Sequence, residues 1–213
     1  MKKNVVLLTL ALVATTLSSY AQVSFGLKAG YNSASISTEN SEGKSRLSGF
    51  HAGVIADLSL AESFSLQPQL LYSAKGAKFK DFDMNDNETK VSYKLNYLEL
   101  PVNFLYKPQV GAGKLFVGAG PYVALGLSGK FGDTKVKFDG KKSEDLDETD
   151  ENAHVKALDA GANFLAGYEL KNGLLFSINY SLGLTNVSPD GEKSKNSYLG
   201  ISVGYLLHSG KKK

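Results

Sequence analysis

Three histidines, His51, His154 and His208, are the side chains best suited to acid–base chemistry in this chain of 213 residues. His51 shares one face of a predicted strand with Asp57, and such a pair could pass a proton. We favour the simpler interpretation that His51 is a polar side chain filling the inside of a barrel. His154 lies in a predicted loop without a partner at the spacing of a lipid hydrolase, and no serine lies in a nucleophile elbow. The sequence therefore predicts no catalytic residue and no enzyme.

Two acidic stretches raise the question of a metal site. The stretch DFDMNDNETKVS from Asp81 begins like a calcium loop, but Asp86 stands where that loop needs glycine and Ser92 where it needs glutamate, so a solvated hairpin loop is expected. The run SEDLDETDE, Ser143 to Glu151, could recruit divalent cations at a lipopolysaccharide surface, although a solvated, mobile loop is its usual interpretation. The chain has no cysteine, which excludes disulfides and thiolate metal sites. We therefore expect no metal and no cofactor.

The N-terminal segment is typical of a secretory signal peptide. Two lysines precede an apolar run from Val5 to Leu17, and Ser19 and Ala21 are the small residues before a cut at Gln22. The apolar run is too short to span a membrane comfortably as an anchor. The expected organisation is a signal peptide over residues 1–21 and one domain over residues 22–213. The formal net charge of +3 is too small to argue for nucleic-acid binding.

Beyond the signal peptide, apolar and polar residues alternate in eight stretches, which is the period of a β-strand with two unlike faces. We expect strands over Val23–Ile36, Gly49–Leu60, Phe64–Lys78, Lys90–Lys107, Lys114–Gly129, Val155–Leu170, Leu174–Val187 and Asn196–His208. Most of them have about ten residues or more, the length that a tilted strand needs to cross a bilayer. The pattern predicts an all-β fold, an eight-stranded antiparallel up-and-down transmembrane β-barrel.

The connections between these strands alternate in length. Those after the second, fourth and sixth strands are short, and the others are long, the longest running from Lys130 to His154. Outer-membrane barrels have short periplasmic turns and long extracellular loops, so we expect both chain ends in the periplasm. Aromatic residues at the strand ends predict two girdles. They are Phe25, Phe64, Tyr106, Tyr168, Phe176 and Tyr205 at one end, and Tyr31, Phe50, Tyr72 and Tyr93 at the other.

The fourth strand has two unlike faces. In YLELPVNFLYK, Tyr97 to Lys107, the even-numbered residues are apolar and are expected to face lipid, while Glu99, Asn103 and Lys107 face the lumen. Pro101 cannot donate to the hydrogen-bond ladder, which predicts a β-bulge nearby. Upstream, the apolar row is odd-numbered (Val91, Tyr93, Leu95), so one extra residue around Asn96–Tyr97 would restore the phase.

The polar faces of the strands predict a filled lumen. Many of the 22 glycines lie on these faces, where they leave room for larger side chains inside a narrow barrel. Isolated buried charges are costly, so we expect the charged residues to form paired networks that plug the barrel. The expected lumen residues are Lys28, His51, Asp57, Lys75, Glu99, Asn103, Asp159, Asn163 and Glu169.

Several segments between about Phe25 and Leu206 share the motifs of a known family. They are FGLKAGYN, FHAGVIADLSL, LQPQLLYSAKGAK, YLELPVNFLYK, GAGPYVALGL, GANFLAGYEL and SINYSLGLTNV. Together they resemble the PorT-like outer-membrane β-barrel family of Bacteroidetes. The resemblance implies a small outer-membrane barrel and, for one subgroup, a link to type IX secretion. The chain departs from many outer-membrane barrels because it ends in LLHSGKKK, without a terminal aromatic residue.

Three functions stay open from the sequence. The leading hypothesis is a non-catalytic barrel in the outer membrane of a Gram-negative bacterium, with an envelope or binding role through long extracellular loops. The second is an accessory barrel of a secretion or transport system, and the third is a soluble periplasmic lipocalin-like barrel with the apolar row inside. The expected partners are outer-membrane lipid and lipopolysaccharide, the barrel assembly machinery, and a secretion-system or extracellular protein, with no nucleic acid.

Overall fold

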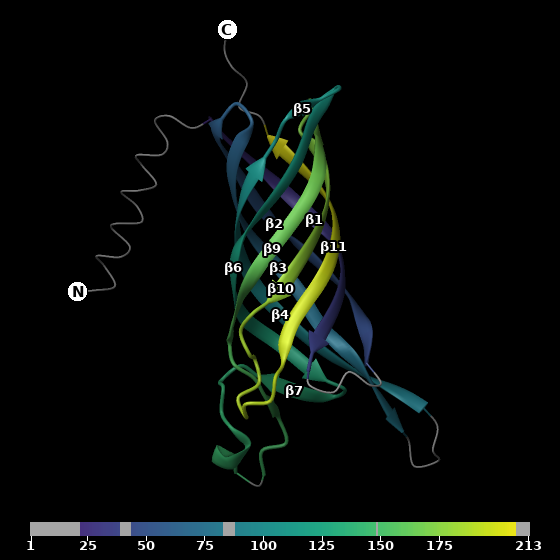
Figure 1. Cartoon of the computed structure of the whole chain (residues 1–213). Helices are drawn as coiled ribbons and strands as arrows, with labels where there is room; N and C mark the ends of the chain where they lie inside the picture. Colours follow the sequence, from purple (N-terminus) through teal and green to yellow (C-terminus); the bar gives the residue numbers. More distant parts are fainter. Residues whose placement is uncertain (1–21, 39–43, 83–87, 148, 208–213) are drawn as a thin grey trace, which may run out of the picture.

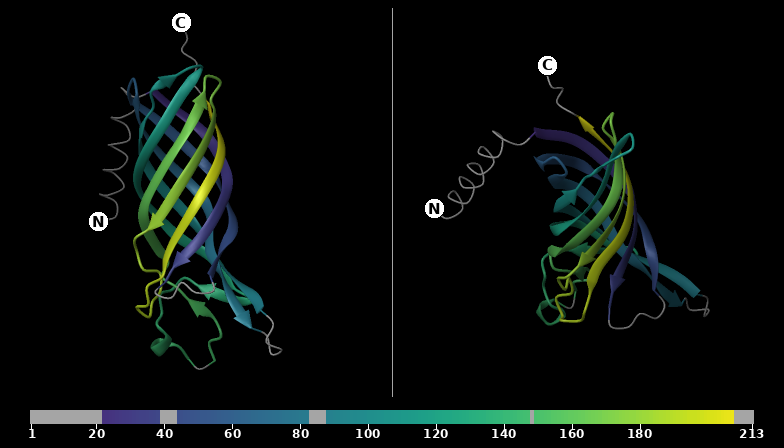
Figure 2. Two further views of the ribbon diagram at one scale, coloured as in Figure 1. Left: turned by 45° about the vertical axis from the view of Figure 1, so that its right-hand side comes forward. Right: turned by 45° about the horizontal axis from the view of Figure 1, so that its top comes forward.

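Eight long antiparallel strands form a closed cylinder in the computed structural model, which describes residues 22–38, 44–82, 88–147 and 149–207 (Figure 1, Figure 2). They are β1 (Gln22–Ser37), β2 (Lys44–Ala61), β3 (Phe64–Phe82), β4 (Glu88–Tyr106), β6 (Gly113–Phe131), β9 (Leu158–Leu170), β10 (Leu174–Gly183) and β11 (Lys195–Leu207). Neighbours along the chain pair with each other, and β1 pairs with β11 to close the barrel. The predicted eight-stranded up-and-down barrel is therefore confirmed. No helix among the described residues has the length and hydropathy of a membrane-spanning helix.

The two ends of the barrel differ in their connections. At one end, which we call the short-turn end, the chain enters β1 and leaves β11, and a two-residue strand β5 (Gln109–Val110) pairs with the start of β6. At the other, the long-loop end, the connection from β6 to β9 is folded (Figure 1). It contains β7 (Thr134–Lys137), the 3-10 turn η1 (Ser143–Asp145) and β8 (Ala153–His154). Because β7 pairs with β6 and β8 pairs in parallel with β7, this loop extends the sheet beyond the cylinder.

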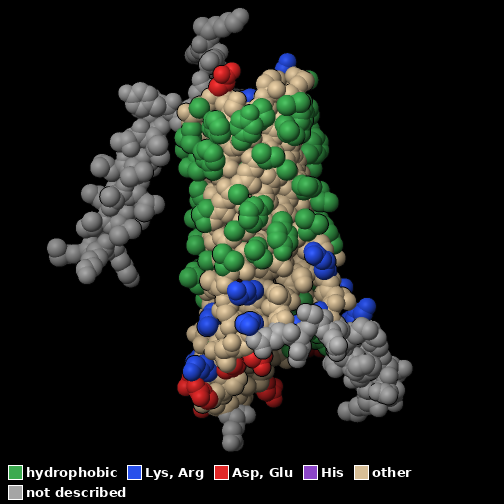
Figure 3. Space-filling model, in the orientation of Figure 1, with side chains coloured by type: hydrophobic (Ala, Val, Ile, Leu, Met, Phe, Trp, Pro, Cys, Tyr) green, Lys and Arg blue, Asp and Glu red, His purple; other side chains and the backbone are tan. Residues whose placement is uncertain are grey.

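The outer face of the cylinder is apolar. Large hydrophobic side chains along all eight strands are exposed, among them Leu27 at 66% and Leu207 at 63%. Figure 3 shows these side chains as a broad band across the face in view, with lysine and arginine gathered beyond it toward the long-loop end. A lipocalin-like barrel would have this row inside. The exposed band contradicts that alternative and fits a wall that faces lipid.

The predicted change of phase in the fourth strand is wrong. Residues Leu95 and Tyr97 have no exposed surface and continue the inward row that contains Glu99. The pairing of β4 with β6 does shift between Asn96 and Tyr97, but the extra residue is Leu127 on β6. The apolar stretch upstream of Tyr97 therefore faces inward, because the barrel interior itself becomes apolar near the long-loop end.

Tyr93 accordingly does not belong to the outer aromatic girdle. It packs against the buried cluster that contains Leu95 and Tyr97. Several strand ends also differ from the prediction, since β2 begins earlier, at Lys44, and β3 ends later, at Phe82. Two other strands are shorter than predicted, because β9 begins after Val155 and β10 ends before Val187. Both valines are buried under the folded loops, and their backbones bond to loop residues instead of neighbouring barrel strands.

Glycines on the inner face make room for large neighbours. A Cβ atom added at Gly30 would lie 2.6 Å from Cε1 of His51, and one added at Gly161 would lie 2.8 Å from Cε1 of Tyr122. Both distances are well below van der Waals contact between carbon atoms. The inner glycines therefore set which bulky side chains the narrow interior can hold.

An arginine on the outer face should destabilise the barrel according to its depth. Ile201 lies in the middle of β11 with 61% of its side chain exposed, and Leu158 lies at the long-loop end of β9 with 59% exposed. We expect Ile201→Arg to lower the free energy of unfolding by about 2–4 kcal/mol, and Leu158→Arg by at most about 1 kcal/mol. Reversible urea unfolding of both variants in liposomes measures the difference. Equal costs would contradict a bilayer centred on the middle of β11.

Candidate functional site

All nine residues predicted for the lumen are buried inside the cylinder. They are Lys28, His51, Asp57, Lys75, Glu99, Asn103, Asp159, Asn163 and Glu169, with exposed fractions between 0% and 5%. The structure does not join them into one network. It divides them among separate groups at different heights along the barrel.

The first group is an ion-pair centre around Lys75. Its Nζ lies 2.8 Å from Oε2 of Glu99 and 3.1 Å from Oδ2 of Asp159, and none of these side chains is more than 1% exposed. The hydroxyl of Tyr198 donates to Glu99 at 2.9 Å, and that of Tyr122 donates to Asp159 at 3.4 Å. The ammonium also lies 4.3 Å from the centroid of the Tyr122 ring, in cation–π contact. One lysine between two carboxylates and aromatic rings satisfies charges that would otherwise be costly to bury.

The second group lies around Lys107, near the short-turn end. Its Nζ lies 2.9 Å from Oδ2 of Asp57 and 2.6 Å from Oε2 of Glu169. The side-chain amide of Gln67 donates to the same oxygen of Asp57 at 3.1 Å. Lys107 was predicted to face the lumen, although the nine-residue list does not include it, and Gln67 lies on the polar row of its strand but was not assigned to the lumen. That alternation is the signal that identifies them.

His51 belongs to a third, uncharged group. Its Nδ1 lies 2.6 Å from Oδ1 of Asn32, and its Nε2 lies 2.8 Å from Oγ of Ser202. Asp57 lies in the Lys107 group instead, so the structure does not bring together the proton-passing pair suggested by the sequence. The other predicted lumen residues make further contacts. Lys28 is linked to the Lys107 group through Gln69 and Gln67, and Asn163 accepts a hydrogen bond from Ser181 at 2.9 Å. The Asn163 amide donates to Asn103 at 3.0 Å, and Lys28 donates to Gln69 at 3.4 Å.

Two apolar clusters lie beside these polar groups in the barrel interior. The order along β4 from the short-turn end is Lys107, Leu105, Asn103, Glu99, Tyr97 and Leu95. Leu105 belongs to a buried cluster with Ile55, Phe116, Leu165, Leu175 and Leu206. Nearer the long-loop end lies a second cluster, which we call the apolar floor, formed by Ile36, Ala77, Leu95, Tyr97, Tyr122, Ala124, Val136 and Val155. The Lys75 centre therefore lies between two apolar layers.

Above the apolar floor, the long loops are tied to each other. Lys137 Nζ lies 2.8 Å from Oδ2 of Asp150, and Ser143 donates from both its backbone N–H and its hydroxyl to Asp190 at 2.8 Å. The pKa of Asp139 is held below its usual range, mainly because the His154 ring hydrogen-bonds to it at 2.8 Å. Hydrogen bonds from Lys137 and from Asn152 likewise lower the pKa of Asp150. Within the described ranges, no set of three His, Asp or Glu side chains is arranged to hold a metal ion.

A pocket of about 650 Å³ opens at the long-loop end, and we call it the mouth pocket. Barrel strands and loops both contribute to it. Its walls are formed by Thr38, Lys44, Phe79, Val91, Tyr93, Phe131, Ala153, His154, Val155, Ser188, Glu192, Lys193 and Ser194. The alternation pattern did not predict this pocket, because its walls combine the ends of four barrel strands with loop residues.

The comparisons with known proteins agree with the barrel geometry. A family model described as an outer membrane protein beta-barrel domain matches residues 18–189. Neisserial surface protein A is similar in structure, with a TM-score of 0.51 and 13% identity over 86% of this chain and 97% of that one. OprG from Pseudomonas aeruginosa matches with a TM-score of 0.46 and 13% identity, over 89% of this chain and 98% of that one. No curated protein matches the sequence.

A third similar structure is Ail from Yersinia pestis, solved with the heparin analogue sucrose octasulfate. It matches with a TM-score of 0.44 and 8% identity, over 87% of this chain and 99% of that one. At 13% identity, the similarity to Neisserial surface protein A shows the fold alone.

Removing the charge of Lys75 should destabilise the barrel strongly. We expect Lys75→Met to lower the free energy of unfolding by about 3–5 kcal/mol, because it leaves Glu99 and Asp159 buried without their cation. Adding Glu99→Gln and Asp159→Asn should recover most of that loss. Urea unfolding in micelles measures the changes, with heat-modifiable mobility on SDS gels as the check of folding.

The exposed pair Lys142–Glu144 supplies the control for Lys75. These side chains are 3.0 Å apart and 55% and 72% exposed. Lys142→Met should change the stability by no more than about 1 kcal/mol, as is usual for exposed ion pairs. A Lys75→Met variant as stable as the wild type would show that the buried centre does not depend on its lysine.

Proposed function

We propose that this chain, which belongs to the outer membrane protein beta-barrel domain family, is a non-catalytic envelope protein that binds its partners at the long-loop end. The family implies an outer-membrane location in a Gram-negative bacterium. In this proposal residues 1–21 are the export signal, the short-turn end faces the periplasm and the long-loop end faces the cell exterior. The start of β1 and the end of β11 at one end, and the folded loops at the other, support that orientation.

In the proposal the lumen is closed to solutes. The supporting observation is that two apolar clusters and two buried ion-pair groups occupy the interior from Lys107 to the apolar floor. A barrel of eight strands has an interior about as wide as its own side chains, so little space remains beside these groups. Because solutes cannot enter a closed lumen, partners would have to bind outside it. The folded loops and the mouth pocket at the long-loop end are available for such binding.

Lipopolysaccharide is the lipid partner that we propose. Lys94, Lys130 and Lys135 lie directly opposite one another on β4, β6 and β7, and all are exposed. Like charges in direct register destabilise a sheet, so this row requires a counter-anion. The row lies beyond the apolar outer face toward the long-loop end, where phosphates of an outer-leaflet glycolipid would meet it.

The other proposed partners are supported by fewer observations. Folding through the barrel assembly machinery follows from the barrel type, and the terminal sequence that such machinery would meet, residues 208–213, lies outside the described residues. An accessory role in type IX secretion depends on the PorT-like resemblance alone. No feature of the described residues favours it over binding at the long-loop end.

Reconstitution into planar bilayers should give no single-channel conductance. Both apolar clusters would have to be displaced before hydrated ions could pass, and moving ions through apolar layers is costly. Heat-modifiable mobility on SDS gels shows that the reconstituted protein is folded, and a porin treated identically shows that the bilayers report conductance. Regular conductance steps that scale with the amount of folded protein would refute the closed lumen.

Neutralising the lysine row should weaken binding to lipopolysaccharide. Each lysine near an anionic surface contributes about 1 kcal/mol, so replacing Lys94, Lys130 and Lys135 with Gln should reduce affinity on the order of 100-fold at low salt. Fluorescent lipopolysaccharide titrated onto the barrel in zwitterionic nanodiscs measures this. A matched variant with Gln at Lys141, Lys142 and Lys156, all exposed in the loop, removes the same charge and should bind nearly normally. Equal losses of affinity in both variants would show that binding depends on the total charge and not on the position of the lysine row.

A further inference from the structure

The mouth pocket has an aromatic wall. Phe79, Tyr93 and Phe131 pack in tilted and edge-on pairs, with ring centroids 6.4, 6.3 and 5.6 Å apart. Phe131 is nevertheless 42% exposed, and it lies beyond the apolar outer face at the end of β6. The apolar floor packs beneath Phe79 and Tyr93 and closes the pocket toward the barrel interior. A concave aromatic surface of this kind suits the apolar part of a small ligand.

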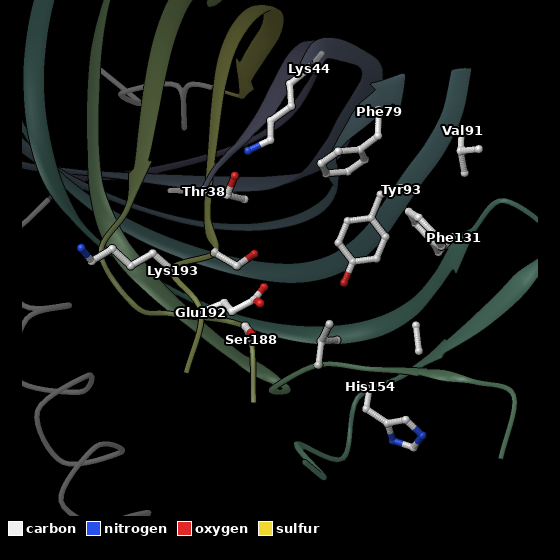
Figure 4. A pocket seen from close by; sticks show the side chains of 13 residues that line it. Thr38, Lys44, Phe79, Val91, Tyr93, Phe131, His154, Ser188, Glu192 and Lys193 are labelled. Carbon is white, nitrogen blue, oxygen red and sulfur yellow. The ribbon is translucent and has the colours of Figure 1, made fainter. Parts of the chain in front are cut away.

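The same pocket contains a lysine whose ammonium group lacks a hydrogen-bond partner. The Nζ atom of Lys44 is buried and has no hydrogen-bond partner among the described residues. It lies 5.9 Å from the centroid of the Phe79 ring, at the outer limit of a cation–π contact. Figure 4 shows Lys44, Phe79 and Tyr93 extending from the barrel strands into one cavity.

Two lysines inside the barrel, Lys75 and Lys107, have partners of a kind that Lys44 lacks. Lys75 and Lys107 each lie within 3.1 Å of two carboxylates. A buried ammonium without such a partner is costly. An anion held in the pocket would supply the missing partner after a rotation about the long Lys44 side chain.

The other charged groups of the pocket leave room for an anion. Glu192 is exposed, so its carboxylate can turn toward water. His154 already pairs with Asp139 outside the pocket wall. A single negative charge near Lys44 would therefore meet one unpartnered cation, with the exposed carboxylate of Glu192 able to turn away.

We propose that the mouth pocket binds a small amphipathic carboxylate. Its carboxylate pairs with Lys44, and its aromatic or alkyl part lies on Phe79, Tyr93 and Phe131. The volume of about 650 Å³ is within the range of ligand pockets, and it exceeds the size of a two-ring carboxylate. This proposal deepens the proposed binding role and rests on it for the access of ligand from outside the cell.

The test compares a carboxylate with its neutral analogue. The probes are 6-fluoro-2-naphthoate and 6-fluoro-2-naphthol, titrated at pH 7 onto the full barrel in phosphatidylcholine nanodiscs and followed by ¹⁹F NMR. Empty nanodiscs give the correction for partition into lipid. A hydrogen bond to a charged group corresponds to about tenfold or more in affinity, so naphthoate should bind at least that much more tightly than naphthol.

Variants then test which pocket residue contacts the carboxylate of the ligand and which contacts its aromatic part. Lys44→Met should abolish the preference for naphthoate and leave naphthol binding nearly unchanged. Phe131→Ala should weaken both probes, and the control Lys142→Met, in the exposed loop, should alter neither. Each variant is first checked for its heat-modifiable mobility, so that a loss of binding is not a loss of folding.

Three outcomes would overturn the proposal. They are no naphthoate binding above empty nanodiscs, equal binding of naphthoate and naphthol to the wild type, and an unchanged preference in Lys44→Met. These results are independent of the bilayer conductance. If the barrel conducts ions but still prefers naphthoate, only the closed lumen is refuted. If the barrel conducts no ions and shows no preference for naphthoate, only the carboxylate site is refuted.

Discussion

The need to pair every backbone N–H and C=O group in a medium without water determines the rest of this structure. In hydrocarbon an unpaired group costs several kcal/mol, and a sheet satisfies all of its groups only when it closes. Here the first and last strands, β1 and β11, pair along nearly their whole length. Closure gives each strand one face toward the surroundings and one toward an enclosed interior. The alternation of apolar and polar residues follows from those two environments.

A closed barrel of so few strands leaves a narrow interior, and this explains its composition. Bulky inward side chains fit because glycines face them, as Gly30 faces His51. Charged side chains are retained where each lysine meets two carboxylates, as around Lys75 and Lys107. A buried ion pair adds little net stability compared with apolar packing. Its effect is instead to make the loss of any one partner costly, which ties distant strands to a single register.

The sequence predicted the fold well because eight long alternating stretches have few other solutions. It failed where the interior stops being polar. Leu95 and Tyr97 are apolar and face inward, so the rule that apolar residues face lipid assigned the wrong phase upstream of Tyr97 and put Tyr93 in the outer girdle. An alternating pattern indicates that a strand has two different faces. It does not indicate which face points inward when both faces carry apolar residues. The bulge was expected at the right level of the barrel but on the wrong strand.

The groupings inside the barrel were less predictable than the residues that line it. Lys75 and Asp159 are 84 positions apart in sequence, and their contact depends on the stagger of the two strands, β4 and β6, that lie between β3 and β9. The mouth pocket depends further on loops that fold back over the barrel, for which alternation gives no signal. The apolar floor beneath that pocket separates it from the charged interior. Ligand capture at the mouth therefore needs no channel through the barrel, and a closed lumen and a binding pocket are compatible parts of one architecture.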